Sequence, residues 1–239
     1  MISISKNAEP TGLANLRQNA IRKNLPPKVA FKTLRGPLKS KVRLSLQEEQ
    51  GQLCAYCMCR IPRADVSPGI APVILEHVFP RSPTGGDDIG QGLDYNNLVA
   101  VCNGNKAEHG TRVFADLTCD AHKENSLFKA INPCDASTLS TIYYELDGTI
   151  TSNDCEVQSD LVDTLNLNCP SSPLISERKE SLSSLILDIE NVCAGDEFAV
   201  LEYCQTLLNA FTTETTLKTP YAGILIWYLK DMIAALTEI

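Results

Sequence analysis

The stretch that decides the fold begins with Cys54-Ala-Tyr-Cys57, continues through Leu75-Glu76-His77-Val78-Phe79-Pro80, and ends with Cys102 and Cys119-Asp-Ala-His-Lys123. Cys54 and Cys57 have the two-residue gap that is typical of a zinc knuckle. Cys102 and Cys119 are the candidates for the second pair of ligands, although sixteen residues separate them instead of the usual two. Together these thiolates predict one structural Zn²⁺ site, because a closed four-thiolate shell leaves no position for water.

The chain has ten cysteines among its 239 residues, which is a high count. In a reducing compartment, Cys-x-x-Cys spacing favours metal binding over disulfides; the alternative is a set of free thiols. Cys59 is a further candidate ligand that could replace either member of the first knuckle. Cys193 and Cys204 lie in helical patterns, where cysteine is usually a small buried apolar side chain.

Composition and charge limit the class of protein. With 44% apolar and 21% charged residues, the chain is expected to be globular, with one or two domains. It shows neither an apolar run of membrane-spanning length nor a signal-peptide stretch, so we expect a cytoplasmic protein without a membrane partner.

The net charge of −8 is unevenly distributed along the chain. Residues 1–45 contain ten Lys/Arg and one acidic residue, whereas residues 135–239 contain four Lys/Arg and seventeen acidic residues. A basic arm beside a catalytic site can hold a phosphate backbone. The same arm could equally be a solvated tail, or dock on the acidic half of the protein.

The pattern of breaks and periodicity divides the chain into three regions. Residues 1–45 predict a basic N-terminal arm, with a short helix near 12–23 and an extended remainder interrupted by prolines. Residues 46–134 predict a helix over 44–52 that delivers the chain into the first knuckle, followed by a core in the order strand, loop, strand, helix. The elements of that core are expected at 73–79, 81–92, 98–101 and from 119 onward.

Residues 135–239 predict a mainly helical region. Asp147-Gly148 marks the turn of a hairpin over 139–151. Apolar residues with 3-4 spacing predict helices over 177–193 and 197–211, and Pro220 is placed to open a third. The predicted fold class is therefore α+β, with a zinc-closed core between a basic arm and an acidic helical region.

The candidate catalytic residues lie among the cysteines. Glu76-His77 is followed by Phe79-Pro80, a glycine-rich loop, Asp94-Tyr-Asn-Asn97-Leu98, and the cysteine cluster that ends in Lys123. This combination resembles the HNH, or ββα-metal, endonuclease family over about residues 50–125. All three histidines, His77, His109 and His122, fall within a 46-residue stretch; His109 lies in an insert and is assigned no catalytic role.

The resemblance implies a role for each matching position. His77 matches the general base that deprotonates the attacking water, and Glu76 the adjacent metal ligand. Asn97 matches the asparagine that pins the loop and orients the base. Asp120 occupies a ligand position usually held by His or Asn, and His122, two residues later, could take that role instead. Oxygen donors at this site suit Mg²⁺ or Mn²⁺ as the catalytic ion.

Two basic residues flank the predicted site. Arg81 and Lys123 are positioned in sequence to contact the phosphate of a nucleic acid, although such residues more often cap a helix or solvate a loop. Both DNA and RNA contain the scissile bond; DNA is the default substrate, and RNA remains open.

A closer resemblance spans about residues 1–135. Ile4-Ser-Lys6-Asn-Ala-Glu-Pro10, the Cys54 knuckle and Cys102-Asn-Gly-Asn-Lys106 are similar to the PtuB nuclease subunits of Septu-type anti-phage systems, some of which are associated with retrons. That family implies an effector nuclease whose partner is PtuA, an ABC-type ATPase. The acidic C-terminal region is then expected to dock on this ATPase.

Two other functions fit parts of the pattern. A catalytically degenerate zinc-knuckle module that binds nucleic acid or protein would explain the departures at Asp120 and in the Cys102–Cys119 gap. A restriction-type HNH enzyme that recognises DNA sequence itself would need a recognition domain, and no segment resembles one.

Overall fold

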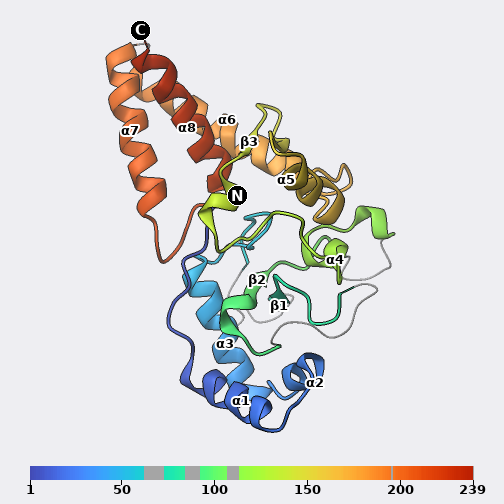
Figure 1. Ribbon diagram of the computed structural model, residues 1–239. Helices are drawn as coiled ribbons and strands as arrows, with labels where there is room; N and C mark the ends of the chain where they lie inside the picture. The colour runs from blue at the N-terminus through green and yellow to red at the C-terminus, as the bar shows by residue number, and fades with distance from the viewer. Residues whose placement is uncertain (62–72, 84–91, 107–112, 195, 239) are drawn as a thin grey trace.

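The computed structural model describes residues 1–61, 73–83, 92–106, 113–194 and 196–238. Its helices and small antiparallel sheets give an α+β fold. In the view of Figure 1, α1 to α3 and the β1–β2 pair form the lower part, and the C-terminal helices rise above them. In the described part of the chain, no helix is long and apolar enough to cross a membrane.

The N-terminal region is mostly helical: the predicted short helix near 12–23 is confirmed, and the extended chain predicted after it is wrong. Its helices are α1 (Thr11–Arg22), α2 (Pro27–Lys32) and α3 (Gly36–Glu49). α2 and α3 each have a proline at the first or second helical position, where the missing N–H costs nothing because that group has no intrahelical partner. Leu13, Leu34 and Leu46 anchor the region in the core, each no more than 2% exposed.

The first residues of the chain are held by a buried carboxylate. The fully buried side chain of Glu49 forms an ion pair with Lys6 and accepts hydrogen bonds from Asn7 N at 2.9 Å and Tyr95 Oη at 2.8 Å. Lys6 Nζ also donates to Leu98 O at 2.8 Å. Lys6 therefore neutralises an internal charge and is not a solvated member of the basic region.

The central element is a two-stranded antiparallel sheet followed by a short helix. β1 (Ile74–His77) pairs with β2 (Leu98–Val101), with His77 opposite Leu98 and Glu76 opposite Val99. The 3₁₀ turn η1 (Tyr95–Asn97) leads into β2, and η2 (Phe114–Asp116) precedes α4 (Cys119–Lys123). The predicted order of strand, strand and helix is thus confirmed.

The C-terminal region contains the predicted hairpin and helices. After η3 (Ala136–Leu139), β3 (Ile142–Tyr144) and β4 (Ile150–Ser152) form the hairpin, and Gly148 takes the positive φ that its turn requires. α6 (Leu174–Cys193), α7 (Glu197–Thr213) and α8 (Ala222–Thr237) match the three predicted helices. The sequence analysis missed α5 (Cys155–Ser159) and the π-helix η4 (Asp160–Thr164) that follows it.

The C-terminal region packs on the loop that carries the first cysteine pair. Lys218 N donates to Gly51 O and Tyr221 N donates to Met58 O, both at 3.1 Å. Cys119 N donates to Leu165 O at 2.8 Å. Both the first cysteine loop and Cys119 are therefore held by backbone hydrogen bonds to the C-terminal region.

Candidate metal centre and adjoining polar cleft

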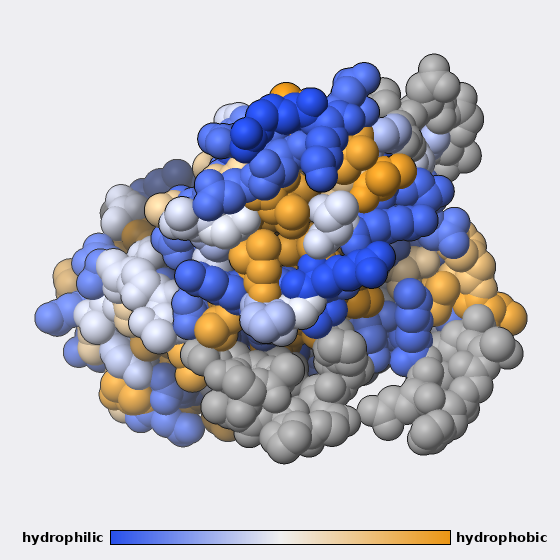
Figure 2. All heavy atoms as spheres, turned by 90° about the horizontal axis from the view of Figure 1, so that it is seen from below, coloured by the Kyte–Doolittle hydropathy of each residue, from blue (hydrophilic) through white to orange (hydrophobic). Residues whose placement is uncertain are grey.

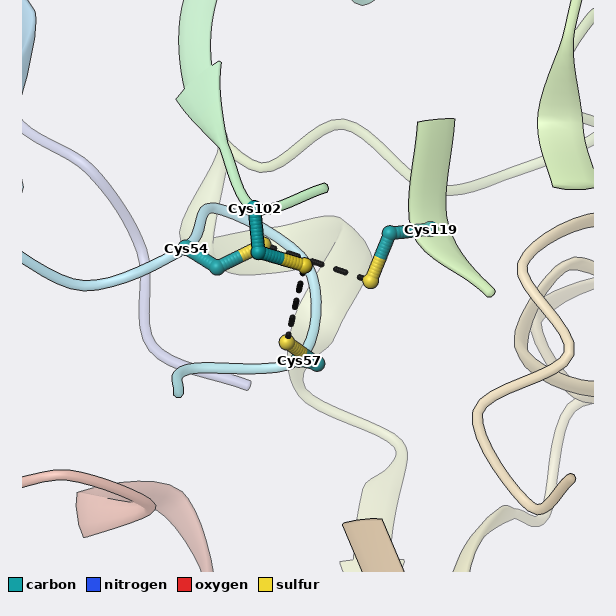
Figure 3. Close-up of side chains that lie close together, drawn as sticks. All are labelled: Cys54, Cys57, Cys102 and Cys119. Carbon is teal, nitrogen blue, oxygen red and sulfur yellow. Dashed lines mark hydrogen bonds between the residues drawn. The ribbon is translucent and has the colours of Figure 1, made fainter. Parts of the chain in front are cut away.

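Four cysteine sulfurs meet at one point although they come from three separate segments. Cys54 and Cys57 lie in the loop after α3, Cys102 directly follows β2, and Cys119 begins α4. All four Sγ atoms lie within 4.8 Å of one another (Figure 3). The Sγ atoms are 3.8 Å apart for Cys57 and Cys102, and 4.0 Å apart for Cys54 and Cys119.

This geometry fits a tetrahedral zinc ion. With Zn–S bonds of about 2.3 Å, the sulfurs of a tetrahedron lie about 3.8 Å apart. Cys54, Cys57 and Cys119 are no more than 2% exposed, so an ion bound here is closed off from water and has a structural role. The cluster confirms the predicted cysteine quartet as a group that could hold zinc. Cys59 does not belong to this group as the structure describes it.

Local backbone geometry explains how the ligands converge. A bridge between Leu53 and Arg60 and the hydrogen bond from Cys54 N to Cys59 O at 2.9 Å close the first loop. At the second pair, Gly104 N donates to Cys102 Sγ at 3.4 Å. Gly104 has φ +64°, and a Cβ there would lie against Ala121, so only glycine lets α4 approach Cys102.

Arg178 of α6 is a residue near this cluster that the sequence analysis missed. Its side chain is 1% exposed and donates to Gly148 O at 2.6 Å and Leu167 O at 2.9 Å. Burial lowers the pKa of Arg178. The thiolates of Cys57 and Cys119 raise it, because their negative charge stabilises the guanidinium. A buried positive charge is therefore available to offset the negative charge of a four-thiolate site.

A polar cleft of about 420 Å³ adjoins the metal centre. Glu76 and His77 of β1, Asp120 of α4, and the basic side chains of Arg81 and Lys106 all line it. With Glu124, three acidic groups, an imidazole and two cations thus share one cleft, and Glu76, His77 and Asp120 lie together as the family resemblance implies.

The environment of His77 keeps its imidazole neutral. The residue is 3% exposed, and Nε2 lies 3.0 Å from Gly92 O. A carbonyl oxygen only accepts, so Nε2 carries the proton and Nδ1 retains its lone pair. Burial lowers the pKa of His77 to about 4, and the positive charges of Arg81 and Lys123 act in the same direction. The imidazole is therefore neutral at physiological pH.

Gly92 connects this histidine to the basic N-terminal region. A Cβ at position 92 would collide with the backbone oxygen of Pro27, at the start of α2, so the approach requires glycine. Phe31 of α2 meets the His77 ring edge-to-face with centroids 4.6 Å apart. The exposed cations of α2 thus lie on an element that contacts the cleft.

Glu76 is paired with a buried lysine. Lys123 Nζ, which is 0% exposed, lies 2.6 Å from Glu76 Oε1 and 3.2 Å from His77 O. Burial raises the pKa of Glu76 to about 8; Lys123 opposes this shift, and Asp120 adds to it through its charge and a hydrogen bond. The buried position of Lys123 does not fit the predicted phosphate contact, because its ammonium already donates to the Glu76 carboxylate and to the His77 carbonyl at the end of β1.

Asn97 clamps the segment that follows His77. Phe79 N donates to Asn97 Oδ1 at 2.7 Å, and Asn97 Nδ2 donates to Phe79 O at 2.9 Å. Val78 N also donates to Asn97 O at 3.0 Å. Asn97 has the geometry to pin this loop, and it orients His77 only through the backbone.

The two candidates for the third site residue face different surroundings. Asp120 lines the cleft, whereas His122 Nδ1 lies 3.1 Å from Thr164 O and its ring stacks on Phe114 with centroids 4.4 Å apart. His122 is thus engaged away from Glu76 and His77, and Asp120 fits the ligand position better. His109 lies outside the described residues.

Arg81 lies where its charge faces the cleft. Its guanidinium carbon is 4.6 Å from the centroid of Phe31, so the ring orients it beside His77. Lys28, Lys32 and Arg35 are exposed on the neighbouring helices. Seen from below, the face of α1 and α2 is largely hydrophilic around a few apolar side chains (Figure 2).

No family model matches this chain, and no curated protein sequence matches it. Evidence about its function therefore comes from the geometry of the metal centre and cleft and from the motifs in its sequence.

Proposed function

We propose that this chain is a metal-dependent endonuclease of the HNH type that hydrolyses phosphodiester bonds, with DNA as the default substrate. One observation carries the proposal: Glu76, His77 and Asp120 line the same polar cleft although β1 and α4 are more than 40 positions apart in sequence. The carbonyl of Gly92, which leaves Nδ1 of His77 as an acceptor, supports the role of general base.

The side chains account for the proton transfer and for substrate binding. His77 Nδ1 takes a proton from a water molecule in the cleft, and the resulting hydroxide attacks phosphorus in line with the departing 3′-oxygen. Arg81 and Lys106 offset the charge of the phosphate, and the exposed cations of α2 and α3 hold the flanking backbone.

The donor set fits a hard divalent cation. Glu76 and Asp120 offer carboxylate oxygens, which Mg²⁺ and Mn²⁺ prefer, and the two groups lie close enough to interact directly. When bound there, such an ion supplies positive charge for the developing 3′-oxyanion. Lys123 donates to Glu76 Oε1 at 2.6 Å and would hold this carboxylate in position beside such an ion.

Replacing Asp120 by asparagine tests the proposal. We expect the Mn²⁺-dependent cleavage rate to fall by about 10²-fold or more, because the cleft loses one of the two carboxylates proposed to hold the ion. The measurement is nicking of a circular DNA over a series of Mn²⁺ concentrations, and raising the concentration should recover part of the rate.

The matched control is Asp116→Asn, since Asp116 lies just before α4 and accepts a hydrogen bond from Ser171 Oγ at 2.6 Å without lining the cleft. This variant should cut at close to the wild-type rate. An Asp120→Asn protein that is as active as wild type would exclude the proposed ion site.

One observation favours the second candidate function, a catalytically degenerate zinc-knuckle module. Glu76 already has a buried ionic partner at 2.6 Å in Lys123, which competes with a catalytic cation. A degenerate module would bind an oligonucleotide without cleaving it under any concentration of Mg²⁺ or Mn²⁺, so binding and cleavage assays on the same preparation separate the two functions.

We further propose that the nuclease is the effector of an anti-phage system with a PtuA-like ABC-type ATPase as its partner. The partner is inferred from the resemblance to PtuB, and the C-terminal helices offer a surface on which an ATPase could dock. Leu187 and Val192 of α6 are each 57% exposed, and Phe198 of α7 is 87% exposed, within a strongly acidic region. Large exposed apolar side chains are typical of protein interaction sites.

A double substitution, Leu187→Arg with Phe198→Arg, is expected to abolish co-purification with the proposed PtuA-like ATPase when the two proteins are co-expressed. Both side chains project from the fold, so zinc content and thermal stability should stay near wild type. Leu146→Arg, at a 62% exposed position on the hairpin turn, is the control and should retain the partner. Retention by the double variant would place the partner surface elsewhere.

A further inference from the structure

A second pocket, of about 470 Å³, is lined by the same stretch of chain as the polar cleft. Over residues 77–81, Val78 and Phe79 line the second pocket, whereas His77, Pro80 and Arg81 line the cleft. A chain of nucleotides with one phosphate in the cleft would therefore have a neighbouring nucleotide within reach of the second pocket.

The chemistry of this pocket differs from that of the cleft. Phe79, which is 46% exposed, and Phe128 provide aromatic surface. Asn96 and Asn132 add amide groups, and Asp94 adds a carboxylate. Within the described residues, the Asn96 side chain bonds to no other group. Lys129 also lines the pocket, and Asp94 is paired with Arg17 at 3.6 Å, so the charges of the pocket are balanced. A flat heteroaromatic ring with donors and acceptors on its edge matches the aromatic and amide walls.

Both walls of the pocket are held in place before any ligand binds. Asn97 clamps the backbone of Phe79 with two hydrogen bonds, at 2.7 and 2.9 Å. On the other wall, the fully buried Asp160 accepts from Lys129 N at 3.0 Å, Ala130 N at 2.8 Å and Ile131 N at 2.9 Å. The pocket is thus preorganised, which lowers the entropic cost of binding.

We propose that this pocket binds one unstacked nucleobase next to the scissile phosphate, so that the substrate is single-stranded or locally unpaired nucleic acid. The inference rests on the proposed nuclease function. A base inside a duplex has its faces covered by neighbours and its edge paired, so it cannot enter between Phe79 and the amides. A free base can stack on the exposed ring, as bases do on aromatic platforms of single-strand binding proteins.

The test is equilibrium binding of a single-stranded DNA 12-mer that contains 2-aminopurine, measured by fluorescence without divalent cation. Phe79→Ala should weaken binding by about 5- to 150-fold, the range for loss of one base–aromatic stack. Leu217→Ala removes an apolar side chain of similar exposure, 57%, between α7 and α8, and should leave the affinity unchanged. Asn96→Ala should weaken binding less than Phe79→Ala and serves as the second pocket variant.

The controls separate the substrate forms and the two proposals. The same sequence as duplex DNA should show no dependence on Phe79, and an RNA 12-mer shows whether DNA and RNA share the pocket. The proposal would be overturned if wild type and Phe79→Ala bound the DNA 12-mer and the RNA 12-mer with equal affinity. It would also be overturned if Phe79→Ala weakened binding of the duplex as much as binding of the single strand. If binding depends on Phe79 but no cation yields cleavage, the pocket stands and the nuclease function fails.

Discussion

Replacing Cys119 by serine is expected to release the zinc ion and to destabilise the protein severely. Cys119 is fully buried, and its sulfur joins α4 to Cys54, 65 positions earlier. In small zinc-binding peptides a structural ion contributes about 10–16 kcal/mol to folding. An ion bound by the four sulfurs would link the loop after α3, the end of β2 and the start of α4, so its loss should also separate Asp120 from Glu76.

Metal content by mass spectrometry and thermal unfolding by circular dichroism measure this outcome. Wild type should contain one zinc per chain, and Cys119→Ser less than a tenth of that with a far lower melting temperature. Cys155→Ser is the matched control, because Cys155 is exposed at the start of α5 and lies outside the four-sulfur group. A Cys119→Ser protein with full zinc content would mean that these sulfurs do not share an ion.

Replacing His77 by alanine is expected to reduce the cleavage rate by about 10²- to 10⁴-fold, the usual contribution of a general base. The structural reason is that Gly92 O holds the proton on Nε2 and leaves Nδ1 able to accept one, as the proposed general base requires. Single-turnover cleavage of a labelled oligonucleotide at saturating Mn²⁺ measures the chemical step. His122→Ala is the matched control: the second histidine contacts Thr164 and Phe114, and its removal should change the rate little. Full activity of His77→Ala would remove the mechanism.

The pH profile offers a second check on the same site. The pKa of His77 is lowered to about 4, so the base is already unprotonated at pH 6 and cannot limit the rate above that pH. Burial raises the pKa of Glu76 to about 8 despite the opposing charge of Lys123, so at neutral pH the carboxyl can carry a proton while it accepts the hydrogen bond from Lys123. Cation binding then competes with that proton, and the rate should rise with pH toward 8. An acid limb centred near pH 6.5 would instead indicate a solvent-exposed histidine as the base.

Part of the site could be predicted because it depends on local spacing. Cys54 and Cys57 belong to one loop, and a two-residue gap by itself brings two sulfurs to a common ion. The positions of β1, β2 and α4 also followed from short apolar runs and turn residues. The N-terminal prolines were misinterpreted as breaks in an extended arm, since proline at a first helical turn and proline in a loop look alike in sequence.

Other features of the site depend on which face of α4 packs against β1. Asp120 and His122 are two residues apart on α4, which places them about 200° apart around the helix axis. Sequence spacing cannot say which of these faces points to β1; the structure turns Asp120 toward Glu76 and His122 toward Thr164. The burial of Lys123 follows from the same rotation, because it lies on α4 next to the sheet.

The sequence by itself determined the α+β class, the first zinc knuckle, the order of the core elements and the C-terminal hairpin and helices, since each depends on residues close together in the chain. Only the tertiary structure decided that Cys102 and Cys119 complete the four-sulfur group, that Asp120 joins Glu76 and His77 in one cleft, and that Asp160 and Arg178 support the surroundings of the site. Those relations join segments far apart in sequence, and they are set by how the elements pack against each other, which local patterns do not encode.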